Sequence, residues 1–287
     1  MNIDHFFTTG QEHVRQGTGC EDYALSGMSD DSARVFAVLS DGCGGANANT
    51  DVGARAICFA FEETMRARLA RAGDWFDEAF LEEMKAAFAL RFSMSPSPQD
   101  YLATLVGLVA SPETATVVTF GDGAHLVRYA DKRYRLQWLE WAGNAPFYLN
   151  YLCRPGHFDR WASEFSAAGR DSAAVECWSV FEETATGELA LLEEGSRERS
   201  LAELMGGHQV SYRPQDEGID GVTIFTDGIF RVSDVAARNA AREFTAYKNF
   251  AGAFVKRRMI SALDKFAKTG NKPQDDLAVA TAWFAQT

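Results

Sequence analysis

Paired cysteines are missing from this sequence. The five cysteines are odd in number and widely scattered, and they form no Cys-x-x-Cys motif and no Cys/His ligand spacing: Cys20, Cys43, Cys58, Cys153 and Cys177. This pattern argues against a disulfide framework and against a zinc site. It suits a reducing compartment, so we expect a cytoplasmic protein.

Long apolar runs and an excess of basic residues are missing as well. No stretch reaches the roughly eighteen uncharged apolar residues of a membrane span, and the first residues, MNIDHFFTTG, lack the parts of a secretion signal. Lys and Arg number 28 against 40 Asp and Glu, a formal charge of −12. A nucleic-acid binder needs clustered cations. We therefore expect a soluble protein that binds neither membranes nor nucleic acid.

Hydrophobic periodicity predicts groups of strands separated by pairs of helices. We expect strands at 1–9, 23–27, 34–40, 104–109, 116–120, 124–129, 133–138, 221–226 and 277–284, and helices at about 50–69, 75–92, 233–244 and 247–268. Either Asn49 or Thr50 caps the first of these helices. Because the order does not alternate strand with helix, a doubly wound parallel sheet fits poorly. We expect an α+β protein in four α/β/β/α layers, with two antiparallel sheets between helix pairs.

Residues 139–208 show the weakest periodicity of the chain. Acidic clusters interrupt them at Glu182-Glu183 and Glu193-Glu194. We interpret the chain as a single domain, 1–287, in which 139–208 is an irregular insertion or flap. If an acidic flap covers a binding site, it should favour basic partners.

The segment SDGCGG, residues 40–45, combines one acid with three glycines in the next four positions. A turn that only reverses the chain usually needs one residue with positive φ. Surplus glycines directly after the apolar strand 34–40 indicate that something approaches the backbone closely at this point.

Four acidic segments stand at the ends of predicted strands. Glu21-Asp22 and Asp275-Asp276 precede strands, whereas Asp41-Gly42 and Asp227-Gly228 follow them. Neighbouring strands place their ends side by side, so these carboxylates can converge, and clustered carboxylates repel each other unless a cation neutralises them. Oxygen ligands without His or Cys suit Mg²⁺ or Mn²⁺. The alternative for any single segment is that Asp-Gly is simply a common turn pair.

In this order and spacing the motifs resemble the metal-dependent protein phosphatase 2C (PP2C) family, in a divergent bacterial branch. The matching motifs cover residues 10 to 284, nearly the whole chain: Glu21-Asp22, Asp41 to Gly45, Gly121-Asp122, Thr226-Asp227-Gly228 and Asp275-Asp276. The resemblance implies the four-layer sandwich, with a centre of two Mn²⁺ or Mg²⁺ ions at one edge of the sheets. It also implies hydrolysis of a phosphate monoester by a water that the two cations activate, without a covalent phosphoenzyme.

Carried over position by position, the resemblance assigns metal ligands to this sequence. Asp41 would bridge both ions and the Gly42 carbonyl would bind one of them. Glu21 and Asp22 would hold the ion nearer the N-terminus, partly through water, and Asp227 and Asp275 would complete the other side.

Three positions depart from the better-known pattern. The phosphate-clamping Arg expected four residues before Glu21 is replaced by Gly17, and Arg15 either reaches the site on a reshaped loop or is a solvated surface residue. Cys43 stands where eukaryotic members carry a His, so the proton donor is either His13 or a metal-bound water. Asp122 matches one ligand of a third metal seen in some bacterial members, but Arg231 occupies the position of the other, which puts a third ion in doubt.

From this resemblance we expect a phosphatase acting on phosphoserine or phosphothreonine in a protein, within the pathway of a cognate Ser/Thr kinase. Two alternatives remain open at this point. One is a phosphatase of the same fold for a non-protein monoester, and the other is a catalytically idle domain that binds phosphoproteins.

Overall fold

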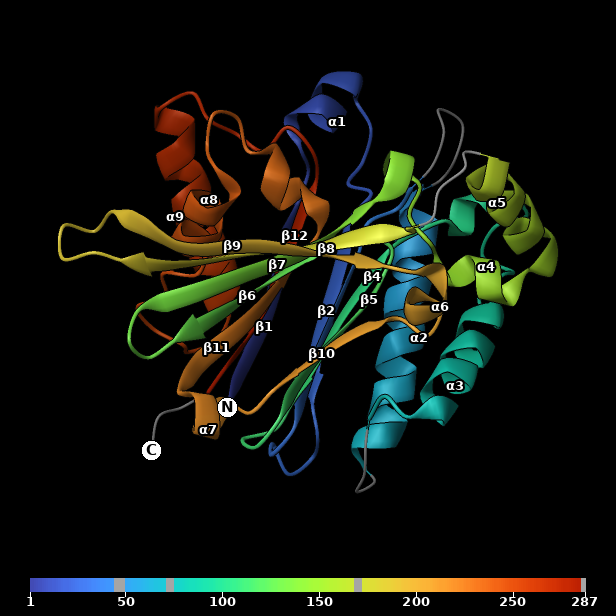
Figure 1. The fold of residues 1–287 in the computed structure, drawn as a ribbon, viewed down its shortest axis with the longest axis horizontal. Coiled ribbons are helices and arrows are strands. Elements are labelled where there is room, and N and C mark those ends of the chain that lie inside the picture. Colours follow the sequence, from blue (N-terminus) through green and yellow to red (C-terminus); the bar gives the residue numbers. More distant parts are fainter. Residues whose placement is uncertain (44–49, 71–74, 168–171, 285–287) are drawn as a thin grey trace.

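The computed structural model describes residues 1–43, 50–70, 75–167 and 172–284, in which two antiparallel β-sheets stack face to face (Figure 1). The seven-stranded sheet has the order β1-β12-β11-β6-β7-β8-β9 and the five-stranded sheet the order β10-β5-β4-β3-β2. The strands are β1 (Asn2–Thr8), β2 (Tyr23–Met28), β3 (Val35–Ser40), β4 (Leu105–Ala110), β5 (Ala115–Phe120), β6 (Ala124–Tyr129), β7 (Arg133–Trp141), β8 (Ala174–Glu183), β9 (Leu189–Arg199), β10 (His208–Tyr212), β11 (Ile219–Phe225) and β12 (Leu277–Trp283).

A pair of helices covers the outer face of each sheet (Figure 1). Helices α2 (Thr50–Leu69) and α3 (Glu78–Ala89) pack on the five-stranded sheet, and α8 (Ala237–Phe244) and α9 (Phe254–Lys268) pack on the seven-stranded sheet. The expected α/β/β/α arrangement is therefore confirmed. The shorter helices are α1 (Gln11–Gln16), α4 (Leu149–Cys153), α5 (Pro155–Ala167), α6 (Leu201–Leu204), α7 (Pro214–Glu217), η1 (Pro98–Tyr101), η2 (Ala142–Asn144) and η3 (Asp227–Arg231).

Strand β3 shows why its sequence is a continuous apolar run. Phe36 and Val38 face the helix pair, whereas Val35, Ala37 and Leu39 face the other sheet, and all five are fully buried. A strand that is buried on both faces cannot alternate between polar and apolar residues. This packing fixes the end of β3, and with it the residue that follows, Asp41.

The expectation that residues 139–208 are irregular is wrong for much of the segment. β7 continues to Trp141, and β8 and β9 are long regular strands at the edge of the seven-stranded sheet. Most β9 side chains are exposed, because the helix pair does not cover this edge. The bulge between Val180 and Phe181 also shifts the pairing register. The segment therefore lacks the apolar alternation from which a strand is predicted.

Strand β10 and the short helices α1 and α7 were not expected, and other boundaries differ by a few residues. Helix α3 begins at Glu78 rather than 75, α8 at Ala237 rather than 233, and α9 at Phe254 rather than 247. Within the part of the chain that the structure describes, none of the helices combines the length and hydrophobicity needed to cross a bilayer. Asn49 and two glycines of SDGCGG, Gly44 and Gly45, lie outside the described residues.

Candidate active site

The acidic segments come together because neighbouring strands share their ends. Tyr23 pairs with Ser40 across β2 and β3, so Asp22 and Asp41 leave the five-stranded sheet side by side. Phe225 pairs with Val279 across β11 and β12, which brings η3 beside the residues that precede β12. Both sets of ends lie under α1, at the top of the view in Figure 1.

One side chain joins the two sheets at this edge. The Thr226 hydroxyl, at the end of β11, donates a 2.6 Å hydrogen bond to Asp22 Oδ2, at the start of β2. Thr226 is also buried, and its Oγ1 accepts the Ala278 amide at 2.9 Å. The acids of both sheets therefore face a common space between the layers.

Asp22 and Asp41 form the centre of this cluster. Asp22 is only 2 % exposed, and loss of hydration raises its pKa well above the ordinary range, with further contributions from the charges of Asp276 and Asp227. Loss of hydration also raises the pKa of Asp41, followed by the charges of Asp22, Asp227 and Asp122. The two carboxyl groups interact directly, and the charge of Asp22 is the largest contribution of any neighbouring acid to the raised pKa of Asp41.

Asp122 and Asp227 complete the group of mutually repelling acids. Burial, followed by the charge of Asp227, raises the pKa of Asp122 to about 7. Burial and then Asp275 raise the pKa of Asp227, while the nearby Arg231 cation lowers it in part. Asp122 sits in the turn between β5 and β6, whose flanking glycines have φ of +86° and +136°, a region that other residues rarely adopt.

Asp276 plays a part that the sequence did not reveal. It is 2 % exposed and accepts hydrogen bonds from the amides of Gly10 at 2.6 Å and Glu21 at 2.5 Å. Its Oδ1 also lies 3.0 Å from His13 Nδ1. Asp276 therefore fixes both ends of the segment that carries α1 and leads into Glu21 and Asp22.

Two glycines make room for the chain at Asp275-Asp276. A Cβ on Gly10 would lie 2.2 Å from the Asp275 carbonyl carbon, and one on Gly228 would lie 1.9 Å from the Asp276 carbonyl oxygen. Backbone therefore packs on backbone around Asp275-Asp276, which no other residue type allows.

Asp41 and Gly42 are held by the chain before β4. The Asp41 amide donates to Thr104 Oγ1 and the Asp41 carbonyl accepts the Thr104 amide, both at 2.9 Å. The Gly42 amide donates to the Glu21 carbonyl at 3.3 Å, which links two of the predicted ligand segments directly. The role of the Gly42 carbonyl as a metal ligand stays a prediction.

The predicted accessory residues His13, Arg15 and Arg231 differ in the charged groups that they contact. Burial alone would lower the pKa of His13, but its hydrogen bond to Asp276 and the charges of Asp276, Glu21 and Asp275 outweigh that effect and raise it. Arg15 lies exposed on α1 without an acidic partner among the described residues. Arg231 lies 3.7 Å from Glu12.

The chemistry of the donor set fits hard divalent cations. In the described ranges, no three His, Cys, Asp or Glu side chains already surround one point as metal ligands do. Burial and the charges of neighbouring acids raise the pKa of both Asp22 and Asp41, and a bound cation would favour the ionised form of these carboxylates. All of these donors are carboxylates, the ligands that Mg²⁺ and Mn²⁺ prefer. Asp22, Asp41 and Asp227, with Glu21 and Asp275 beside them, are therefore suited to hold such ions.

Comparison with known proteins agrees with the fold. The model of the family described as Protein phosphatase 2C matches residues 9–277, and the chain belongs to that family. No curated protein matches the sequence.

Several solved structures share the fold at low sequence identity. The serine/threonine phosphatase Stp1 from Staphylococcus aureus is 15 % identical with a TM-score of 0.55, over 100 % of this chain and 96 % of that one. The S. agalactiae serine/threonine phosphatase is 12 % identical with a TM-score of 0.51, over 99 % of each chain. A bacterial serine phosphatase is 13 % identical with a TM-score of 0.54, over 100 % and 99 %.

Proposed function

We propose that this protein is a Mn²⁺- or Mg²⁺-dependent phosphatase that hydrolyses phosphoserine and phosphothreonine in a protein substrate. The observation that carries the proposal is the convergence of Asp22, Asp41, Asp122 and Asp227 at one edge of the two sheets, where burial and the charges of neighbouring acids raise the pKa of each of them. A fold does not keep such repulsion without a use for it, and cation binding is the use that carboxylates serve.

The residues around the cluster have distinct roles in this proposal. Glu21, Asp22, Asp41, the Gly42 carbonyl, Asp227 and Asp275 hold two ions. Bound divalent cations supply the positive charge that activates a water nucleophile and offsets the charge developing on the phosphoryl oxygens. We propose no third ion, because the Arg231 cation already acts on Asp227. Asp276 is a positioning residue, since it fixes the backbone of Glu21.

His13 and Arg15 are our candidates for the proton donor and the phosphate contact. The raised pKa of His13 keeps its ring protonated to higher pH, and Asp276 engages Nδ1, so Nε2 is the nitrogen that would protonate the leaving oxygen. Arg15 is on the same short helix, and its guanidinium forms no ion pair with an acid among the described residues. An unpaired Arg is suited to contact phosphate oxygens.

The substrate and setting follow from the same proposal. The compared bacterial structures carry the names of serine or serine/threonine phosphatases, which favours a phosphoprotein from a Ser/Thr kinase pathway as the partner. All five cysteines are free, which suits a cytoplasmic protein. The acidic pairs expected to select basic substrates lie on β8 and β9, where Glu183 pairs with Arg242 and Glu193 accepts the Trp178 indole N–H. Their effect on specificity remains a prediction.

The test compares hydrolysis of p-nitrophenyl phosphate and of a phosphothreonine peptide, each with Mn²⁺ and with chelator. The variants are the unchanged protein, Asp41→Asn, and the matched control Asp264→Asn, whose side chain is exposed on α9. We expect turnover of both compounds only with Mn²⁺, loss in Asp41→Asn, and no change in the control. Equal activity in chelator would contradict the metal mechanism, and turnover of the small ester alone would contradict the protein substrate.

A further inference from the structure

The charge of this acidic protein is unevenly distributed. Residues 237–272 contain nine Lys or Arg and two acidic residues, a net charge of +7, whereas the rest of the chain has 19 Lys or Arg and 38 acidic residues, a net charge of −19. The positive segment consists of α8, α9 and the loops after them, which cover the outer face of the seven-stranded sheet (Figure 1). This segment is therefore basic although the whole chain is strongly acidic.

Many cations on this face have no counter-charge. Elsewhere Arg side chains commonly pair with acids, as Arg66 does with Glu62 at 2.8 Å and Arg91 with Glu63 at 2.6 Å. In the positive segment, six cations have no acidic partner within the described parts of the chain: Arg238, Lys248, Lys256, Arg257, Lys268 and Lys272. The segment itself holds only two acids, Glu243 and Asp264, and Glu243 is already paired.

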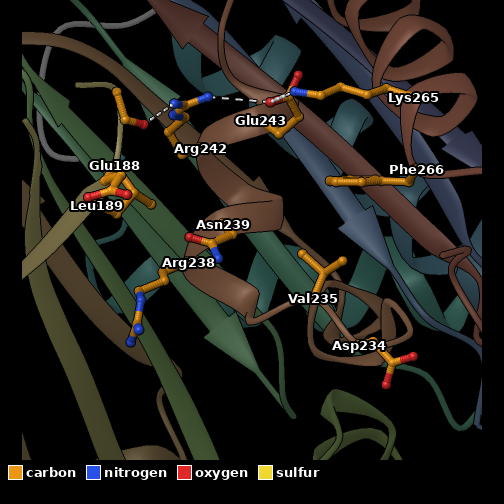
Figure 2. A pocket seen from close by; sticks show the side chains of 11 residues that line it. Glu188, Leu189, Asp234, Val235, Arg238, Asn239, Arg242, Glu243, Lys265 and Phe266 are labelled. Carbon is orange, nitrogen blue, oxygen red and sulfur yellow. Dashed lines mark hydrogen bonds and ion pairs between the residues drawn. The ribbon is translucent and has the colours of Figure 1, made fainter. Parts of the chain in front are cut away.

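The same face is hollowed by two cavities. One, of about 490 Å³, lies between the β8–β9 turn, α8 and α9, and is lined by Arg238, Arg242 and Lys265 together with Phe266 (Figure 2). The second, of about 200 Å³, is lined by Lys248, Arg257 and Arg258 with two aromatic rings. The two cavities and the six cations that line them form what we call the α8–α9 groove. These cations are Arg238, Arg242, Lys248, Arg257, Arg258 and Lys265.

Glu243 lies between the two cavities and forms ion pairs with cations that line each of them. It lines the first cavity and pairs with Arg258 of the second, with Lys265 at 2.9 Å, and with Arg242 at 3.3 Å. Arg242 in turn donates to the Gly187 carbonyl at 2.9 Å, which ties the β8–β9 turn to the groove (Figure 2). Because Glu243 is only 10 % exposed and already has three cationic partners, it cannot neutralise Arg238, Lys248 and Arg257 as well.

We propose that the α8–α9 groove docks an acidic polypeptide segment of a partner protein. Arg238, Lys248 and Arg257 would face its carboxylates, and one aromatic or aliphatic side chain would enter the larger cavity, where Phe266 and Val235 give an apolar wall. A side-chain anchor surrounded by charged contacts is the usual form of a peptide interface. A flat lipid surface does not reach into a cavity, and Glu188 and Asp234 at its rim oppose a nucleic-acid backbone.

Fluorescence anisotropy with the full chain tests the proposal independently of catalysis. The probe is a labelled oligo-Glu peptide with one central Phe, compared with the same peptide carrying a central Gly and with an oligo-Lys peptide. We expect the Phe peptide to bind best, binding to weaken with salt, and no binding of the Lys peptide. Equal binding of the Phe and Gly peptides would contradict the anchor and overturn the proposal as stated.

Charge reversal locates the binding. Arg238→Glu with Arg257→Glu should weaken binding of the Phe peptide at least about tenfold. The matched double variant Arg197→Glu with Arg213→Glu, at exposed positions outside the groove, should leave it unchanged. Turnover of p-nitrophenyl phosphate should be the same in all three proteins, since none of these residues belongs to the acidic cluster. Equal weakening by both double variants, or tighter binding of anionic lipid vesicles or RNA than of the peptide, would overturn the proposal.

Discussion

Replacing Asp276 with Ala should destabilise the protein substantially, although it removes an acid from a repulsive cluster. The carboxylate accepts the amides of Gly10 and Glu21, and both lose their acceptor in Asp276→Ala. An unsatisfied buried donor costs about 1–3 kcal/mol, so the two amides together cost about 2–6 kcal/mol. Loss of the contact with His13, whose side chain is 18 % exposed, adds to this cost when the ring is protonated. Relief of the repulsion that Asp276 exerts on Asp22 offsets part of the loss.

The assay is urea unfolding at neutral pH in chelator, so that metal binding does not mask the change. Asp276→Asn keeps one oxygen acceptor but presents an NH₂ group to the other amide, so it should fall between the unchanged protein and Asp276→Ala. Asp264→Ala, at an exposed site on α9, is the control and should change stability by no more than about 0.5 kcal/mol. If Asp276→Ala were as stable as this control, the clamp that we assign to Asp276 would be refuted.

Three further predictions follow from the same geometry. Gly228→Ala should lower Tm sharply and abolish activity, because its Cβ would lie 1.9 Å from the Asp276 carbonyl oxygen. The control Gly206→Ala, whose Cβ would have nothing within 4 Å, should be tolerated. Similar melting curves for the two variants would disprove the close packing. Activity should fall as pH rises through the raised pKa of His13, since the protonated donor is lost, and His13→Gln should remove this limb of the pH profile; an unchanged profile would exclude His13 as the acid. In chelator, thermal stability should decline as pH rises from about 4 to about 7. The reason is that folded Asp122, with a pKa of about 7, binds its proton more tightly than the unfolded residue at 3.8. Mn²⁺ should flatten this decline, and a stability that instead increases over this range would contradict the assigned repulsion.

The sequence predicted what local patterns encode. β3 was evident because burial on both faces leaves a continuous apolar run, and Asp41 was located because it follows that run directly. β8 and β9 were not evident, since an uncovered edge strand does not need an apolar face and a bulge shifts its pairing register. The role of Asp276 as acceptor for the Gly10 and Glu21 amides was also beyond prediction, because these amides lie more than 250 positions away in the chain.

The same limit applies to the chemistry of the site. Spacing in the sequence indicated that acids stand at strand ends, but only the pairing of β2 with β3 and of β11 with β12 shows which ends meet. The hydrogen bond from Thr226 to Asp22, which joins the two sheets, has no signature in either local segment. Contacts between distant segments depend on the packing of whole layers rather than on any short pattern.

The measurement that tests the central claim most directly is calorimetric titration of the metal-free protein with Mn²⁺, compared with Asp41→Asn. The account predicts two bound ions for the unchanged protein, with protons released as the raised pKa values of Asp22 and Asp41 fall, and loss of this binding in the variant. Absence of Mn²⁺ binding in a folded protein that still hydrolyses phosphopeptide would contradict the claim that the acidic cluster is a metal centre.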